Sequence, residues 1–155
     1  MSGTTPPAAI TCGGLSVAYG ATAALIGVDL DVGQGQVLAL LGASGSGKTT
    51  LLHALAGFIR PTDGEVRLAG EVVAGEGRWV APEHREVGLV FQGAALWPHL
   101  TVLDTVAYPM RRRGSSRAEA RGRAEVLLGQ FGLSELADRL PAQLSGGEQQ
   151  RVGLA

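Results

Sequence analysis

The chain has 155 residues, of which 45% are hydrophobic and 17% are charged, a composition typical of globular proteins that excludes a disordered one. The net charge of -1 excludes a general attraction to nucleic acid, and the single Cys12 excludes an internal disulfide. No apolar run approaches the roughly 20 residues of a membrane-spanning helix. Residues 1–9 lack a basic residue and an apolar stretch, so we expect a flexible tail rather than a secretory signal.

The first half of the chain begins with a pattern of strands. Ile10–Tyr19 and Ala23–Val32 are predicted to be two strands joined by a turn at Gly20. The continuous apolar run Val37–Leu41 predicts a buried strand. Thr50–Ala56 then predicts a helix, because Gly57 is a natural stop after its apolar residues.

Between that strand and that helix, the segment GASGSGKTT fits the phosphate-loop pattern G-x-x-x-x-G-K-[ST]. Glycines allow a tight turn whose N–H groups point inward, and the helix N-terminus adds unpaired donors. Lys48, the only lysine of the chain, supplies a point charge for phosphate, and the Thr49 hydroxyl suits Mg²⁺. A glycine-rich turn that binds nothing is the disfavoured alternative. The residues assigned to phosphate binding are Gly42, Ser44, Gly45, Ser46, Gly47, Lys48, Thr49 and Thr50.

Turns and short strands follow. Pro61–Gly64 predicts a turn and Glu65–Leu68 a strand. The glycine-rich stretch 70–82 predicts a loop, with a short strand at Glu71–Ala74 as the alternative. Val87–Phe91 is a continuous apolar run that predicts a buried, parallel-type strand.

From Thr101 the pattern becomes helical. Thr101 is a suitable N-cap, Pro109 is expected to end or kink the first helix, and Ser116 with Glu119 forms a capping box. The three expected helices cover 102–108, 116–131 and 134–139. Six arginines lie between Arg111 and Arg123; we favour a solvated helical face over a nucleic-acid patch, because acidic residues are interspersed.

A second specific motif, LSGGEQQR, covers residues 144–151. Ser145, Gly146 and Gly147 precede a helix expected to start near Glu148, which predicts a second anion site at a helix N-terminus. An ordinary serine cap with a flexible approach explains the same residues. The residues alone do not decide between these interpretations.

Together the two motifs resemble the nucleotide-binding subunit of ATP-binding cassette (ABC) transporters, whose signature sequence LSGGEQQR matches letter for letter. The resemblance runs from about Ile10 to Ala155 and covers nearly the whole chain. It implies an α/β fold: a P-loop NTPase core, an antiparallel β-subdomain near the N-terminus and a helical subdomain over residues 93–143. It also implies that the fold is incomplete at the C-terminus.

The resemblance assigns further residues. Tyr19 is similar to the aromatic that stacks on adenine, although a core aromatic at a strand end is the alternative. Gln92 is similar to the glutamine that touches Mg²⁺ and the attacking water, with a polar strand end as its alternative. Residues 82–88 and 95–102 resemble the importer branch, where Leu96 and Trp97 either dock a transmembrane partner or pack within the helical subdomain.

The implied function is ATP hydrolysis that drives solute import through membrane-spanning permease subunits, at the cytoplasmic face of the membrane. Two such subunits close head to tail, so that ATP and Mg²⁺ on the phosphate loop of one meet Ser145, Gly146 and Gly147 of the other. Lys48 and Gln92 carry the catalytic roles, and Thr49 and Gln92 the metal contacts. Binding of nucleic acid is not implied.

The sequence also departs from the family pattern. Gly93 stands where this branch often has an acidic residue, and the chain ends at Ala155, before the family's apolar strand that ends in Asp-Glu. We therefore expect a gap between the strands 37–41 and 87–91, low stability and little hydrolysis by this chain alone. The rival functions are a nucleotide-binding module without catalysis, or a defunct fragment. A soluble ABC protein of DNA repair or translation is disfavoured, because no sustained heptads lie between Gln92 and the signature.

Overall fold

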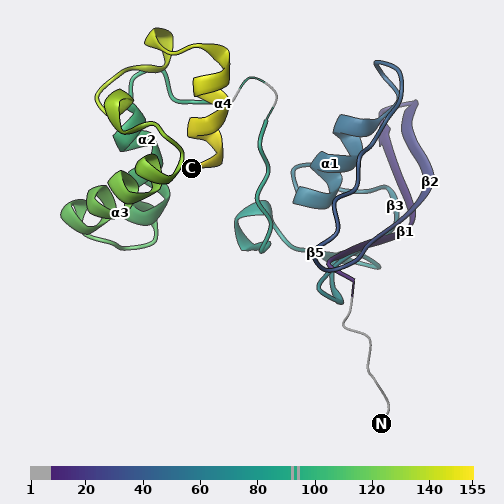
Figure 1. Cartoon of the computed structure of the whole chain (residues 1–155). Coiled ribbons are helices and arrows are strands. Elements are labelled where there is room, and N and C mark those ends of the chain that lie inside the picture. The colour runs from purple at the N-terminus through teal and green to yellow at the C-terminus, as the bar shows by residue number, and fades with distance from the viewer. Residues whose placement is uncertain (1–7, 92, 94) are drawn as a thin grey trace. The chain divides into compact units, whose positions relative to one another are not determined.

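The computed structural model describes residues 8–91, 93 and 95–155, so most of the expected tail and Gln92 lie outside the described residues. The chain forms two compact units, residues 1–89 and 90–155, which appear in Figure 1 as a sheet with one helix and as a group of helices. Each unit has its own hydrophobic core. The helical subdomain was expected from Gly93, and the second unit begins at Val90.

The first unit is built on a five-stranded antiparallel sheet with the strand order β2-β1-β3-β4-β5. The first predicted hairpin is confirmed, and β4 exists where a short strand was the alternative to a loop. A fifth strand was not predicted, because its neighbouring glycines indicate a loop. The strands are β1 (Ile10–Tyr19), β2 (Thr22–Val32), β3 (Asp63–Leu68), β4 (Glu71–Gly75) and β5 (Arg78–Trp79).

One face of this sheet is covered by the helix α1 (Lys48–Ala56), which begins two residues before the expected Thr50 (Figure 1). Leu51 and Leu55 of α1 belong to the same hydrophobic core as Leu15 of β1 and Val66 of β3, both fully buried. Burying a side chain of this size stabilises the fold by about 2 kcal/mol. This packing fixes α1 to the sheet.

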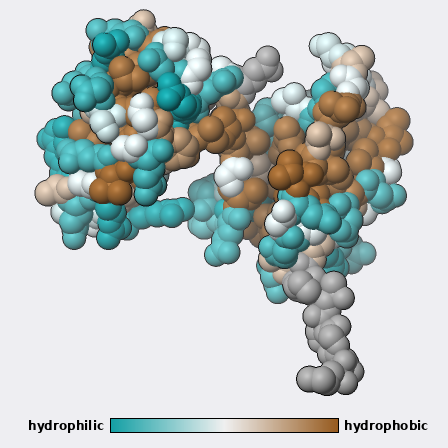
Figure 2. Space-filling view, viewed as in Figure 1, coloured by the Kyte–Doolittle hydropathy of each residue, from teal (hydrophilic) through white to brown (hydrophobic). Residues whose placement is uncertain are grey.

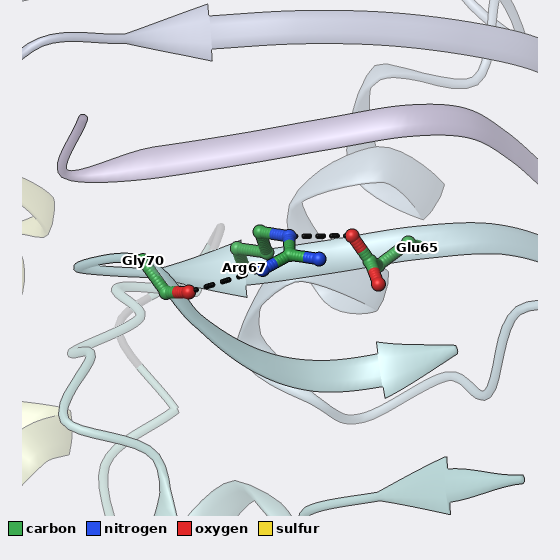
Figure 3. Close-up of polar contacts among 3 residues, drawn as sticks. All are labelled: Glu65, Arg67 and Gly70. Atoms are coloured by element: carbon green, nitrogen blue, oxygen red, sulfur yellow. Dashed lines mark hydrogen bonds and ion pairs between the residues drawn. The ribbon is translucent and has the colours of Figure 1, made fainter. Parts of the chain in front are cut away.

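The hairpin between β3 and β4 is supported by an exposed polar arrangement (Figure 3). Arg67 pairs with Glu65 on the same strand, and its Nη1 donates to the carbonyl oxygen of Gly70 at 3.3 Å. The turn uses left-handed backbone at Ala69, with φ 47°, and at Gly70, with φ 87°. Because exposed ion pairs contribute little, Arg67 adds a minor term to the stability of the hairpin.

The predictions of buried strands at 37–41 and 87–91 are wrong. Neither 37–41 nor 87–91 forms a strand, and Val37 and Leu41 are 98% and 92% exposed instead of buried. Val90 and Phe91 are exposed as well, and apolar surface of this kind is visible in Figure 2. A strand exists only where a neighbour pairs with its backbone, and in the described part of the chain no strand pairs with either segment. A gap between these two segments was expected; the loss of the strands themselves was not.

The second unit contains α2 (Val102–Arg112), α3 (Arg117–Gln130) and α4 (Gly146–Leu154), with short 3₁₀ helices at Ser134–Leu136 and Pro141–Gln143. The predicted Thr101 cap and the capping box of Ser116 with Glu119 are confirmed. Buried side chains of α2, α3 and α4 and of the connections between them meet in one core; they include Val102, Ala107, Ala124, Leu128, Leu133 and Val152.

Two helix boundaries differ from expectation. Pro109 lies inside α2 instead of ending it, because only one hydrogen bond is lost and Arg113 N–H donates to the Pro109 carbonyl at 3.1 Å. The expected helix 134–139 is only a 3₁₀ turn, Ser134–Leu136.

Among the six arginines between Arg111 and Arg123, Arg121 pairs with Asp104 at 2.6 Å, and the other five are exposed, as a solvated face requires. Within the described residues, no helix is both long and apolar enough to cross a bilayer.

Candidate functional site

The N-terminus of α1 lacks the side-chain cap that helices usually have. Gly47 occupies the N-cap position with φ 88°, makes no side-chain hydrogen bond to the helix, and no acidic residue lies in the first turn. Leu51 N–H closes the first turn by donating to the Gly47 carbonyl at 2.8 Å. The N–H groups of Lys48, Thr49 and Thr50 precede that first bond, so this end of the helix offers donors and a positive dipole end to an anion.

Lys48 faces back over the loop that precedes it. Its Nζ donates to the carbonyl oxygens of Gly42 at 2.9 Å and Ala43 at 2.6 Å, and to Ser46 Oγ at 3.1 Å. The ammonium group therefore lies beside the residues that the sequence assigned to phosphate binding. A positive charge and a row of N–H donors face the same small region, which suits a polyphosphate.

Close packing explains two of the glycines in this loop. A Cβ at Gly47 would lie 2.7 Å from Leu25 Cδ2 and 2.8 Å from the Ala24 carbonyl oxygen, so the loop contacts the beginning of β2. A Cβ at Gly42 would lie 2.8 Å from Ser46 Oγ. The start of β2 and the tight loop thus set the position of the α1 N-terminus.

Tyr19 ends β1 at the same end of the first hairpin. It pairs with Thr22, only two residues before Ala24, which contacts Gly47. The side chain is 54% exposed, so Tyr19 is not the core aromatic of the alternative interpretation. An exposed ring near the loop is free to stack on a planar ligand.

The N-terminus of α4 differs from that of α1 because the protein caps it. The Ser145 hydroxyl and N–H both donate to Glu148 Oε2 at 2.7 Å, and Glu148 N–H donates to Ser145 Oγ at 3.4 Å. This reciprocal capping box agrees with the serine-cap interpretation. Gly146 and Gly147 are exposed, with open space where a Cβ would lie, so their N–H groups remain accessible from outside.

The hydrogen bonds from the Ser145 hydroxyl and backbone hold the pKa of the Glu148 carboxyl below its ordinary value, with smaller help from Arg151 and Arg139. Gln149 anchors the same helix by donating to the Pro141 carbonyl at 3.0 Å. Sequence reasoning missed the role of Glu148, although the S-x-x-E spacing that identified the box at Ser116 also occurs here.

The remaining predicted residues divide between the units. The phosphate loop and Tyr19 belong to the first unit, and Ser145, Gly146 and Gly147 to the second. Gln92 lies outside the described residues. Leu96 packs partly into the helical core, whereas Trp97 is 42% exposed and its ring lies 4.5 Å from that of Tyr108. Leu96 therefore follows the packing interpretation in part, and docking of a transmembrane partner stays a prediction.

The chain is similar to known proteins over nearly its whole length. A family model described as "ABC transporter" matches residues 25–155. The spermidine/putrescine import ATP-binding protein PotA of Frankia alni is 47% identical over 153 residues, which are 96% of this chain and 32% of that protein. The taurine import ATP-binding protein TauB of Chromobacterium violaceum is 49% identical over 150 residues, 96% of this chain and 55% of that protein.

A solved structure has the same fold. The protein cbiO1 from Clostridium perfringens, described as part of the ABC transporter complex cbiONQ, superposes with a TM-score of 0.79 at 25% identity. The match covers 96% of this chain and 60% of that chain. The chain thus spans about a third to somewhat over half the length of the curated relatives it matches.

Proposed function

Because the chain belongs to the ABC transporter family, we propose that it is the nucleotide-binding part of an importer's ATP-binding subunit, in which ATP hydrolysis drives solute uptake. The observation that carries this proposal is the uncapped N-terminus of α1, with Lys48 beside it. Relatives that are 47% and 49% identical carry import ATP-binding names, which support it. Those names refer to different solutes, so the proposal extends to solute import in general.

The residues of the first unit fit a nucleoside triphosphate. The N–H groups of Lys48, Thr49 and Thr50 would hold phosphate oxygens, and Lys48 Nζ would exchange its loop carbonyls for them. Gly42, Ser44, Gly45, Ser46 and Gly47 would form the backbone cradle, and Tyr19 would stack on the base. Mg²⁺, when bound, neutralises charge on the phosphates. The exposed Thr49 would hold it together with Gln92, which is also our candidate for orienting water.

The second unit offers a complementary contact. We assign the open N-terminus at Gly146 and Gly147, with Ser145, to the nucleotide bound by a second ATP-binding subunit in a head-to-tail dimer. Two observations support this assignment: nothing fills the space outside these glycines, and the serine hydroxyl is held at the helix start by Glu148. A hydroxyl, N–H groups and a helix dipole suit the terminal phosphate.

Permease subunits are the proposed membrane partners, and the chain would therefore work at the cytoplasmic face of the membrane. Trp97 and Tyr108 form an exposed aromatic pair on the second unit. Aromatic side chains are enriched in the buried centres of protein interfaces. We place the permease contact at this pair.

Titration calorimetry with ATP and Mg²⁺ tests the proposal. Lys48→Ala should lower nucleotide affinity about 100-fold, because a charged contact to phosphate is lost. Arg67→Ala is the matched control: it also removes one positive charge from the first unit, but from an exposed strand position that pairs with Thr11, at the end of β1 opposite Tyr19. Equal affinity of the Lys48→Ala variant and the unmodified chain, or the absence of any magnesium-dependent ATP binding, would contradict the proposal.

A further inference from the structure

Arg85 is a buried charge that the proposed function does not use. Arg85 is only 6% exposed, and no other charged residue in the described part of the chain is buried to this extent. Neither of the two ion pairs recorded among the described residues includes it. Burial of a charge is costly unless hydrogen bonds replace those lost to water, so the contacts of Arg85 inside the fold must offset that cost.

The guanidinium of Arg85 joins three segments of the first unit. Nη1 donates to the carbonyl oxygens of Ala54 at 2.9 Å and Leu55 at 2.7 Å, both in the last turn of α1. Nη2 donates to the Val73 carbonyl of β4 at 3.3 Å, and Nε to the Val80 carbonyl after β5 at 2.9 Å. All three nitrogen atoms of the planar group are therefore bound to backbone oxygen.

Two further residues shape this arrangement. The guanidinium lies over the Trp79 ring, with Cζ 4.8 Å from the ring centroid. Gly57, which follows α1, approaches so closely that a Cβ there would lie 2.7 Å from Arg85 Nε. Burial lowers the pKa of Arg85, but an arginine keeps its charge at neutral pH even so. The site is thus built around a permanent cation.

This cation lies at the end of α1 opposite the phosphate loop. The last carbonyl groups of a helix have no partner within it and carry the negative end of its dipole, so a guanidinium there both satisfies and stabilises them. The nine residues of α1 span about 13 Å, and a helix of this length moves as a rigid rod. A tilt at its C-terminal end would redirect the N–H groups at its N-terminal end.

We propose that Arg85 is a positioning residue for the phosphate site: it fixes the C-terminal end of α1 to the sheet, so that the N-terminal N–H groups keep the direction that a polyphosphate requires. The inference rests on the proposed function of the loop. It goes beyond that function in giving a role at the site to a residue outside the loop. The competing explanation is that Arg85 only supports the folding of the first unit.

Comparison of two variants of the full chain separates these explanations. Arg85→Lys keeps the charge but has one nitrogen with three N–H donors, which cannot reach all four carbonyl oxygens that Arg85 binds. Leu68→Ala is the control, because Leu68 packs against the same core but lies at the end of β3, where it pairs with Ile10. Affinity for a fluorescent ATP analogue with Mg²⁺ is measured under conditions where both variants are folded, together with urea unfolding and hydrogen exchange of residues 51–53, which begin with the first hydrogen-bonded amide of α1.

Arg85→Lys should lower nucleotide affinity about tenfold, through misdirected donors, and Leu68→Ala should leave the affinity of the folded protein unchanged. Arg85→Lys should also speed exchange at residues 51–53. Unchanged affinity and exchange in Arg85→Lys would overturn the positioning role, as would losses of affinity that follow stability equally in both variants. If Arg85→Lys does not fold, Trp79→Leu, which removes only the ring beneath the guanidinium, takes its place with the same expectations.

The two proposals fail in different ways. If the unmodified chain binds no nucleotide, the proposed function is wrong, and the exchange of residues 51–53 still decides whether Arg85 positions the helix start. If the unmodified chain binds nucleotide and Arg85→Lys binds it equally well with unchanged exchange, only the positioning role is wrong.

Discussion

The helices α1 and α4 both begin after glycine-rich segments, yet their first N–H groups have different partners. At α1 the N-cap is Gly47, and neither a capping side chain nor an acidic residue is present in the first turn. At α4, Ser145 and Glu148 cap each other. The comparison shows that a glycine-rich segment before a helix does not by itself fix how the helix start is capped: α1 has no capping side chain, and α4 has a complete capping box.

The largest expected difference between the two helix starts concerns their glycines. Gly47→Ala should destabilise the first unit by about 3 kcal/mol, because φ is positive and the new Cβ meets Leu25 and the Ala24 carbonyl. Gly146→Ala should instead stabilise the second unit by about 0.5 kcal/mol, because Gly146 is helical and open space surrounds it. Hydrogen exchange of each unit measures both effects, and similar changes in the two variants would remove the distinction.

A smaller effect is expected from the serine cap. Ser145→Ala should cost the second unit about 1 kcal/mol, the usual loss for an N-cap serine. Ser116→Ala is the matched control, since the same capping box begins α3. Urea unfolding should show a similar loss in both variants. If Ser145→Ala has no effect while Ser116→Ala destabilises, the cap at α4 is not structural.

The smallest expected effect is a pH dependence of stability at the two helices, α3 and α4, that begin with a Ser–Glu capping box. The pKa of Glu148 is lower in the folded chain than in the unfolded chain, mainly through the Ser145 hydroxyl. Its contribution to stability is therefore complete above the unfolded pKa of about 4.3 and is lost as the pH falls through the folded value. NMR titration of the carboxyl groups should show Glu148 titrating below this value, as should Glu119 of the other box. Titration of Glu148 at or above the ordinary value would show that the capping box is absent in solution.

Local patterns in the sequence predicted the first hairpin, the helix after the phosphate loop, and the capping of α2 and α3. Each depends on neighbours a few residues away, so the sequence is sufficient. The strands 37–41 and 87–91 were predicted from apolar runs alone, and they fail because a strand needs a partner that no run of residues can specify. In the same way, an apolar run does not reveal that Val37 is exposed.

The residues of the candidate site also divide into those marked by local spacing in the sequence and those brought together only by the fold. The phosphate loop and the signature could be found from spacing, since glycine, lysine and serine at fixed positions have few other uses. Arg85 could not, because its partners come from α1, β4 and the segment after β5, which lie 5 to 31 positions away in the sequence. Glu148 could have been found from its spacing to Ser145, but the two glycines between them drew the interpretation towards a ligand.

The contacts of Lys48 with its own loop have a consequence for selectivity. Its ammonium group already has three oxygen acceptors, from Gly42, Ala43 and Ser46. An incoming anion must replace all of them to gain the lysine. Chloride carries a single charge and cannot offer several oxygen atoms at once, whereas a triphosphate can. Lys48 should therefore favour a polyphosphate over small monovalent ions, because only a ligand with several oxygen atoms can replace all three loop acceptors.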